Sequence, residues 1–275
     1  MSPVRCETAV HNAATPAIRQ SQDGRAERSL VSERLLRCYP EAAFGGFTDV
    51  DGTIAFYART RSLMSPDHVV LDIGCGRGNL GDDPIVVRRN LRIFKGDVRR
   101  VLGIDVDIAA AGNPYIDEFR HISCRRWPID DASVDVAIAD CVIEHVGDPD
   151  ALFSEARRVL RPGGFLCLKT PNAWGYVALV SRLVPNWAHA KVVAQAQGGY
   201  YRRDCDVFPT LYRCNTRRKL RAALTRHQFR CVVYSYEAEP SYLEFSGLAY
   251  KLGVWHQRYA PKALRLVLFA FGQAQ

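Results

Sequence analysis

The fold is decided by the stretch Val69-Val70-Leu71-Asp72-Ile73-Gly74-Cys75-Gly76-Arg77-Gly78. Its first half is a short apolar run, which predicts a buried strand. Its second half has a glycine at every other position, which predicts a tight turn whose backbone can approach a ligand closely. The loop also contains the spacing Gly-x-Gly-x-x-Gly at Gly76, Gly78 and Gly81, which by itself would indicate a dinucleotide site.

Further strands follow this loop along the chain. Apolar runs that predict strands lie at 98–104, 134–139, 165–169, 231–236 and 266–271. Helical patterns separate them, the plainest over 149–160, and strands alternating with helices indicate a parallel sheet covered on both faces. The last two runs predict an antiparallel hairpin. The expected fold is α/β, a doubly wound sheet of about seven strands, mostly parallel with an antiparallel C-terminal edge strand.

The rest of the chain divides into three parts around this sheet. Residues 1–28 are polar and aperiodic, which predicts a mobile N-terminal tail. Helical patterns within 29–65 predict an N-terminal cap. Residues 172–212 are rich in Trp, Tyr, Pro and His without clear alternation, which predicts an insertion that forms a lid at the carboxyl edge of the sheet. We expect residues 29–275 to form a single domain.

Composition excludes several classes of protein. The 275 residues carry a net charge of +8 with 48% apolar and 24% charged residues, which excludes a disordered, highly charged chain. The nine cysteines are odd in number and include no Cys-x-x-Cys pair, so neither a disulfide framework nor structural zinc is expected. Free cysteines indicate a cytoplasmic protein. No apolar run reaches the roughly 18–20 residues that span a bilayer, although peripheral membrane contact stays open.

Most of the excess charge lies in one segment. Between Arg202 and Arg230 there are nine basic residues and two acidic ones. One interpretation is a solvated helix face, with the helix over 215–224. The other is a surface for a phosphate-bearing or anionic-lipid partner. A nucleic-acid partner is not favoured, because no aromatic residues are interleaved with the charges of that helix.

The glycine loop allows two interpretations. The glycine series begins at Gly74, two residues before the Gly-x-Gly-x-x-Gly spacing, so the full pattern is Asp-x-Gly-x-Gly-x-Gly. This pattern favours a tight turn beneath a part of the ligand that carries no phosphate. Asp82 and Asp83 add negative charge where a pyrophosphate would lie. Asp105, at the end of the second strand, can accept hydrogen bonds from two ribose hydroxyls and fits either a nicotinamide oxidoreductase or another adenosine ligand.

Five stretches in this order and spacing resemble the class I S-adenosylmethionine-dependent methyltransferases. They are the cofactor motifs 69–78 and 103–105, the approach to the fourth strand at 130–137, the turn at 144–146, and the helix and glycine turn at 155–164. The resemblance covers about 66 to 175. Through the stretches 46–53, 170–172 and 208–216, the whole chain also looks like a bacterial subgroup of unknown substrate near the methyltransferase type 11 group. The resemblance implies a Rossmann-like sheet and S-adenosyl-L-methionine as the cofactor.

The resemblance also implies a role for each motif residue. The glycine loop would pass under the methionine part, the end of the second strand would hold ribose and adenine, and the tip of the fourth would lie near the sulfonium. Where the family often has an acidic residue for the adenine amine, this chain has Ser123, a neutral and weaker acceptor. The implied cofactor-binding residues are Asp72, Gly74, Cys75, Gly76, Gly78, Asp105, Val106, Ser123, Cys124, Asp140 and Cys141.

An oxygen or nitrogen acceptor must also lose a proton, which histidine commonly takes near neutral pH. His145 is the first candidate and His189 the second; a purely structural role is the alternative for each. Some relatives, such as quinone O-methyltransferases, bind a metal through Glu-x-x-Glu-His, but Cys141 replaces the first acid here, so no metal is expected. The candidate acceptor residues are Trp174, Tyr176, Tyr212 and Arg213.

The expected function is methyl transfer to a small-molecule or glycan acceptor, at oxygen. Two alternatives stay open besides the oxidoreductase. One is an RNA or other anionic-polymer methyltransferase that uses the basic segment 202–230, and the other is a cofactor-binding protein without turnover. The sequence does not name the acceptor or the oligomeric state.

Overall fold

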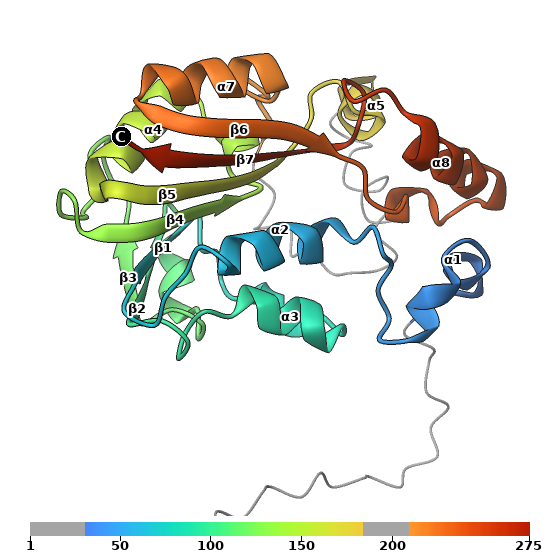
Figure 1. Cartoon of the computed structure of the whole chain (residues 1–275), viewed down its shortest axis with the longest axis horizontal. Helices are drawn as coiled ribbons and strands as arrows, with labels where there is room; N and C mark the ends of the chain where they lie inside the picture. Colours follow the sequence, from blue (N-terminus) through green and yellow to red (C-terminus); the bar gives the residue numbers. More distant parts are fainter. Residues whose placement is uncertain (1–30, 184–208) are drawn as a thin grey trace, which may run out of the picture.

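A computed structural model describes residues 31–183 and 209–275, whose seven strands form one sheet in the order β3-β2-β1-β4-β5-β7-β6 (Figure 1). This confirms the α/β fold and the strand number expected from the sequence. The strands are β1 (Val69–Ile73), β2 (Arg100–Asp105), β3 (Glu118–His121), β4 (Val134–Asp140), β5 (Leu160–Pro171), β6 (Phe229–Tyr236) and β7 (Val267–Ala274).

The direction of the strands follows the expected pattern, with one refinement. The pairs β1–β2, β1–β4, β2–β3 and β4–β5 are all parallel. β7 is antiparallel to both β5 and β6, so the expected antiparallel C-terminal strand is confirmed. It lies one place in from the edge, because the chain returns between β5 and β6 and leaves β6 as the edge strand.

Helices cover both faces of the sheet (Figure 1). On one face α4 and α7 bury Phe153, Leu220 and Leu224 against the sheet. On the other, α2 buries Phe56 and Tyr57 against it. The helices are α1 (Glu33–Cys38), α2 (Gly52–Arg61), α3 (Val86–Arg92), α4 (Pro149–Val159), α5 (Tyr176–Leu183), α7 (Arg217–Arg226) and α8 (Gly247–Tyr259), with 3-10 turns η1 (Pro40–Ala43), η2 (Asn79–Asp82), η3 (Ile108–Gly112), η4 (Ile143–His145) and η6 (Ser241–Leu243).

The helix ends follow local rules. The basic helix predicted over 215–224 is α7, capped by the Thr216 hydroxyl, which accepts from the Lys219 amide. Helix α4 ends at Val159, before the glycine pair expected to end it, and β5 already begins at Leu160. The glycine is needed for another reason, because a Cβ at Gly164 would lie 2.9 Å from the backbone oxygen of Asp135.

Three expectations fall partly or wholly outside the described residues. The predicted tail 1–28 and His189 lie entirely outside the described residues. Most of the predicted lid at 172–212 also lies outside them. Of the lid, α5 and residues 209–212 are described, while the cap at 29–65 contributes α1, η1 and α2. Within 31–183 and 209–275, no helix combines the length and apolar character needed to cross a membrane.

Phe269 of β7 is the clearest test of the core. Its fully buried ring lies 5.0 Å from Tyr236 and 5.4 Å from Phe56, centre to centre. We expect Phe269→Ala to lower the free energy of unfolding by about 3–5 kcal/mol, because the cavity loses both apolar burial and ring contacts. Urea denaturation measures this, and Val232→Ala on the exposed side of β6 should change it by less than about 0.5 kcal/mol. Equal losses in the two variants would contradict this packing.

Candidate functional site

The loop after β1 is built from three left-handed glycines. Gly74, Gly76 and Gly78 have φ angles of +68°, +57° and +86°. A Cβ at Gly74 would lie 2.7 Å from the Val142 side chain, and one at Gly78 would lie 2.8 Å from Pro114. A Cβ at Gly76 would have no described atom within 4 Å apart from its chain neighbours. The loop is therefore closed on the protein side and open at Gly76, where a ligand can lie against bare backbone.

A second set of contacts holds this loop in place. The Asn113 side-chain amide donates to the carbonyl oxygens of Cys75 at 2.9 Å and Gly76 at 3.2 Å. Arg77 pairs with Asp107 at 2.7 Å. Asn113 and Arg77 were not predicted from the sequence, because only the pairing of β1 with β2 brings the loop beside residues 105–113.

Asp105 lies beside the open side of the loop. One carboxylate oxygen accepts from the Gly76 amide at 2.9 Å and the other from the Asp107 amide at 2.8 Å. Each oxygen keeps a further lone pair, so the carboxylate can also accept from two hydroxyls of a ribose. The next apolar side chains, Val106 and Ile108, are 59% and 64% exposed, which suits a flat, partly apolar ring. These residues fit an adenosine group.

Ser123 and Cys124 follow β3 at the same edge. β3 pairs with β2 so that His121 lies opposite Asp105, two residues before Ser123. Both side chains are exposed, and the Cys124 thiol donates to the Arg126 carbonyl oxygen at 3.2 Å. The ring of His121 lies 3.0 Å from the Val106 carbonyl oxygen, which fixes the backbone beside the adenosine side of the loop.

Two carboxylates, Asp72 and Asp140, end neighbouring strands. Burial raises the pKa of Asp72 to about 7, and the charge of Asp140 adds to the rise. Burial would also raise the pKa of Asp140, but Lys169 and Arg92 together hold it below its usual value. The Lys169 ammonium lies 3.0 Å from the Asp140 carboxylate, and the Tyr57 hydroxyl donates to it at 2.9 Å. Asp140 is therefore ionised at neutral pH, whereas Asp72 titrates there.

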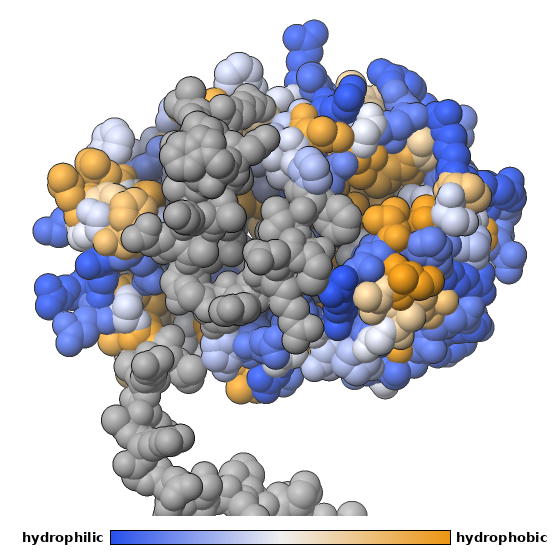
Figure 2. All heavy atoms as spheres, turned by 180° about the vertical axis from the view of Figure 1, so that it is seen from behind, coloured by the Kyte–Doolittle hydropathy of each residue, from blue (hydrophilic) through white to orange (hydrophobic). Residues whose placement is uncertain are grey.

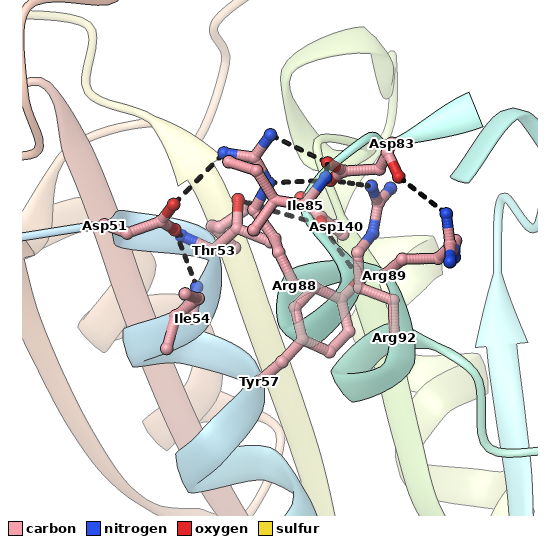
Figure 3. Close-up of polar contacts among 11 residues, drawn as sticks. Asp51, Thr53, Ile54, Tyr57, Asp83, Ile85, Arg88, Arg89, Arg92 and Asp140 are labelled. Carbon is pink, nitrogen blue, oxygen red and sulfur yellow. Dashed lines mark hydrogen bonds and ion pairs between the residues drawn. The ribbon is translucent and has the colours of Figure 1, made fainter. Parts of the chain in front are cut away.

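The partners of Asp140 come from elements that sequence analysis did not connect with the site. Tyr57 comes from α2, Arg92 from α3 and Lys169 from β5, and Figure 3 shows Tyr57 and Arg92 close to Asp140. The Lys169 ammonium also lies 3.3 Å from the Thr53 hydroxyl. One signal was available in the sequence, since a lysine that ends an otherwise apolar buried strand is rarely left unpaired.

Asp83 does not have the effect expected from the sequence. Its carboxylate is buried and accepts from the Arg88 guanidinium at 2.6 and 2.8 Å (Figure 3). Arg88 also contacts Asp51, whose other oxygen caps the start of α2. Because this cation neutralises Asp83, the prediction that the charge of Asp83 would repel a pyrophosphate was wrong.

His145 lies in η4, at the turn after β4. Its Nδ1 is 3.0 Å from the carbonyl oxygen of Pro209, and its Nε2 is 4.0 Å from the Glu144 carboxylate. Glu144 is buried and accepts from the Thr170 hydroxyl at 2.9 Å, and burial raises its pKa. The Asn215 side chain in turn donates to Thr170 at 2.6 Å. The histidine is thus backed by a buried polar chain that sequence analysis had not identified.

The other candidate residues are spread along the same edge. The Glu144 carbonyl oxygen accepts from the Tyr212 amide, which places Tyr212 beside the histidine turn, while the Arg213 side chain is exposed. Trp174 is also exposed, and the ring of Tyr176 packs edge-on against His256 of α8.

Cys141 has a positive φ of 57° and donates its amide to the Lys169 carbonyl oxygen at 2.8 Å. Burial raises the pKa of its thiol. In the described part of the chain, no three His, Cys, Asp or Glu side chains are grouped to hold a metal ion.

Part of the chain matches a known protein family. Residues 71–168 match the family model described as a methyltransferase domain. This part of the chain, residues 71–168, is thus similar to a methyltransferase domain. The match begins inside β1 and ends inside β5, so it contains the glycine loop, Asp105, Asp140 and His145. The resemblance stated from the sequence motifs is confirmed, and with it the cofactor class.

Individual relatives also match part of this chain. A "probable S-adenosylmethionine-dependent methyltransferase" of Mycolicibacterium smegmatis is 39% identical over 108 residues, which are 38% of this chain and 38% of that protein. A ubiquinone biosynthesis O-methyltransferase of Bartonella tribocorum is 28% identical over 132 residues, 46% of this chain and 52% of that protein. The chain thus spans about two fifths to one half of these relatives. A solved geranyl diphosphate C-methyltransferase of Streptomyces coelicolor aligns with 79% of each chain at 21% identity and a TM-score of 0.47.

The raised pKa of Asp72 gives the stability of this protein a testable pH dependence. Between about pH 4 and pH 7 the folded state keeps a proton on Asp72 that the unfolded state releases. The free energy of unfolding should therefore fall as pH rises through this window. Asp72→Asn should remove that contribution and be more stable than wild type at pH 8 by about 2–4 kcal/mol.

Urea denaturation at several pH values measures this difference. Glu239 also has a pKa raised to about 7, by burial and by Asp51, but it is present in both proteins and cancels. Asp97→Asn, at an exposed carboxylate, is the matched control. Parallel curves for wild type and Asp72→Asn would show that Asp72 is already ionised in the folded protein.

Proposed function

We propose that this protein binds S-adenosyl-L-methionine across the glycine loop and transfers the methyl group to an oxygen of a small-molecule or glycan acceptor. The observation that carries the proposal is the open backbone at Gly76, bordered by the oriented carboxylate of Asp105 and the exposed Val106. Asp105 would hold the ribose and Val106 the adenine. When bound, the cofactor supplies an electrophilic methyl group, and the protein supplies placement.

The remaining cofactor contacts follow from the same edge of the sheet. Asp72 would pair with the amino group of the methionine part, which favours its ionised form and lowers its pKa. Ser123 would accept from the adenine amine. Tyr57 and Lys169 hold the Asp140 carboxylate in place, and it would face the methionine end of the cofactor.

We assign the acceptor proton to His145. The Pro209 carbonyl oxygen fixes the ring at Nδ1, and the Glu144 carboxylate would stabilise the imidazolium once a proton has moved to it. The acceptor would lie among Trp174, Tyr176, Tyr212 and Arg213. Transfer to oxygen is also supported by the ubiquinone biosynthesis O-methyltransferases among the relatives.

We further propose that residues 29–275 act as one domain with a helical cap at 29–65 and an acceptor-side lid at about 172–212. The cap is supported by α2, which packs Phe56 into the sheet and joins Tyr57 to Asp140. The lid is supported by α5, which follows β5 at the carboxyl edge.

An anionic-polymer acceptor is the second candidate. Arg218, Lys219 and Arg221 expose their side chains on α7, and the Asn215–Thr170 hydrogen bond joins the start of that helix to the carboxyl edge. Binding to RNA through these cations would weaken steeply with salt, whereas binding of a neutral acceptor would not. A protein that binds cofactor but transfers no methyl group to any component of a host extract would be the third case.

Cofactor binding can be tested without knowing the acceptor. We expect S-adenosylhomocysteine to bind the purified protein in calorimetry, and Asp105→Asn to weaken binding about tenfold or more, because a charge-assisted hydrogen bond is lost. Asp97→Asn, remote from the loop, should bind as wild type. Wild-type protein that fails to bind at millimolar concentration, or that binds NADH instead, would overturn the proposal.

The role of His145 can be tested with labelled cofactor and fractionated host extract, followed by mass analysis of the labelled product. We expect His145→Gln to slow transfer by about 10²–10⁴-fold, because the acceptor proton loses its base. Affinity for S-adenosylhomocysteine and the melting temperature should not change. A variant that loses cofactor affinity and stability together with activity would show that His145 is structural.

A further inference from the structure

Helix α8 exposes a continuous apolar stripe. Leu248, Leu252, Trp255 and Tyr259 are 72%, 60%, 64% and 69% exposed, and their spacing of four, three and four residues places them on one face. The opposite face is buried through Tyr250 and Val254. Figure 2 shows hydrophobic surface gathered over this helix at the left of the view. An exposed stripe of this size marks an interaction surface rather than ordinary surface composition.

The charged residues of α8 itself and of the chain after it are all basic. From Ser246 to Gln275 the sequence contains no aspartate or glutamate. Lys251 and Arg258 lie beside the stripe on α8, and Lys262 follows the helix; all three side chains are exposed. Leucine with tryptophan and tyrosine, bordered by cations, is the composition of helices that lie in the interface of an anionic membrane.

We propose that α8 docks this protein on an anionic phospholipid bilayer, with the stripe in the boundary between headgroups and acyl chains. Its 13 residues are too few to span a bilayer, so the helix lies in the plane of the surface. Lys251 and Arg258 then meet lipid phosphates. A second copy of the chain is the less favourable occupant, because two facing α8 helices would bring these cations together without an acidic residue on either helix.

The position of α8 gives the docking a consequence. The helix lies beyond the end of the sheet at which β4 and β5 finish (Figure 1), and its His256 packs against Tyr176 of α5. A bilayer bound to α8 therefore lies near the same end of the molecule as the glycine loop and His145. Docking does not depend on the proposed function and can be measured without the methyl acceptor.

The test uses the full chain and vesicles of phosphatidylcholine with about one-third phosphatidylglycerol. We expect wild type to co-sediment with these vesicles and to bind pure phosphatidylcholine much more weakly. Leu252→Gln/Trp255→Gln should lower vesicle affinity about tenfold or more, because the stripe loses its apolar contact. Lys251→Gln/Arg258→Gln should lower it as well and reduce its dependence on salt.

Val232→Gln is the matched control, because Val232 is equally exposed but lies on β6. Melting temperatures should be the same in all variants, since the changed side chains are exposed. Trp255 emission should shift to the blue on vesicle addition, and Trp255→Phe should lose that shift. The proposal would be overturned if the wild-type protein did not bind anionic vesicles, or if the stripe variant bound them with wild-type affinity. A dimer that the stripe variant converts to monomer would assign the surface to a second copy instead.

Discussion

Two carboxylates end adjacent parallel strands on the same face of the sheet, and much of the structure is arranged around them. Asp72 and Asp140 lie in partly buried surroundings, where like charges are costly unless cations or protons compensate them. Lys169 and Tyr57 contact Asp140 directly, and Arg92 lowers its pKa from α3. Helices α2 and α3 are thus held against the sheet by electrostatics as well as by apolar packing. Helix α2 therefore contributes a side chain to the site.

The negative charges of Asp72 and Asp140 are compensated unequally, which gives the two carboxyl groups different protonation states near neutral pH. Asp140 receives the cation and the phenol, while Asp72 receives burial and a neighbouring negative charge. One carboxyl group stays ionised, and the other is ready to ionise when a cationic ligand group approaches. A second ionic cluster of Asp51, Asp83 and Arg88 links the start of α2 to α3. Arg92 connects the two clusters, because it lies 3.9 Å from Asp83 and also lowers the pKa of Asp140.

The sequence predicted what is encoded locally. The strand at 69–73 and the glycine turn could be predicted, because an apolar run and a series of glycines determine the local backbone conformation of their own segment. Asn113, Arg92 and Lys169 were not identified, because strand register and helix packing bring them to the site from distant positions. The prediction for Asp83 was wrong although its partner is local. Its charge was considered without Arg88, which lies five residues later and pairs with it.

The end of β5 connects the two halves of the site. Successive side chains of a strand point to opposite faces, so Lys169 and Thr170 belong to different polar clusters. Lys169 contacts Asp140 on the face covered by α2, while Thr170 donates to Glu144 on the face covered by α4 and α7. Glu144 lies beside His145, so a shift of this strand end would move the carboxylate near the cofactor loop and the support of the histidine together. The antiparallel pairing of β5 with β7 runs through both residues and fixes that end. This explains why a C-terminal strand far from the motifs is needed for the geometry of the site.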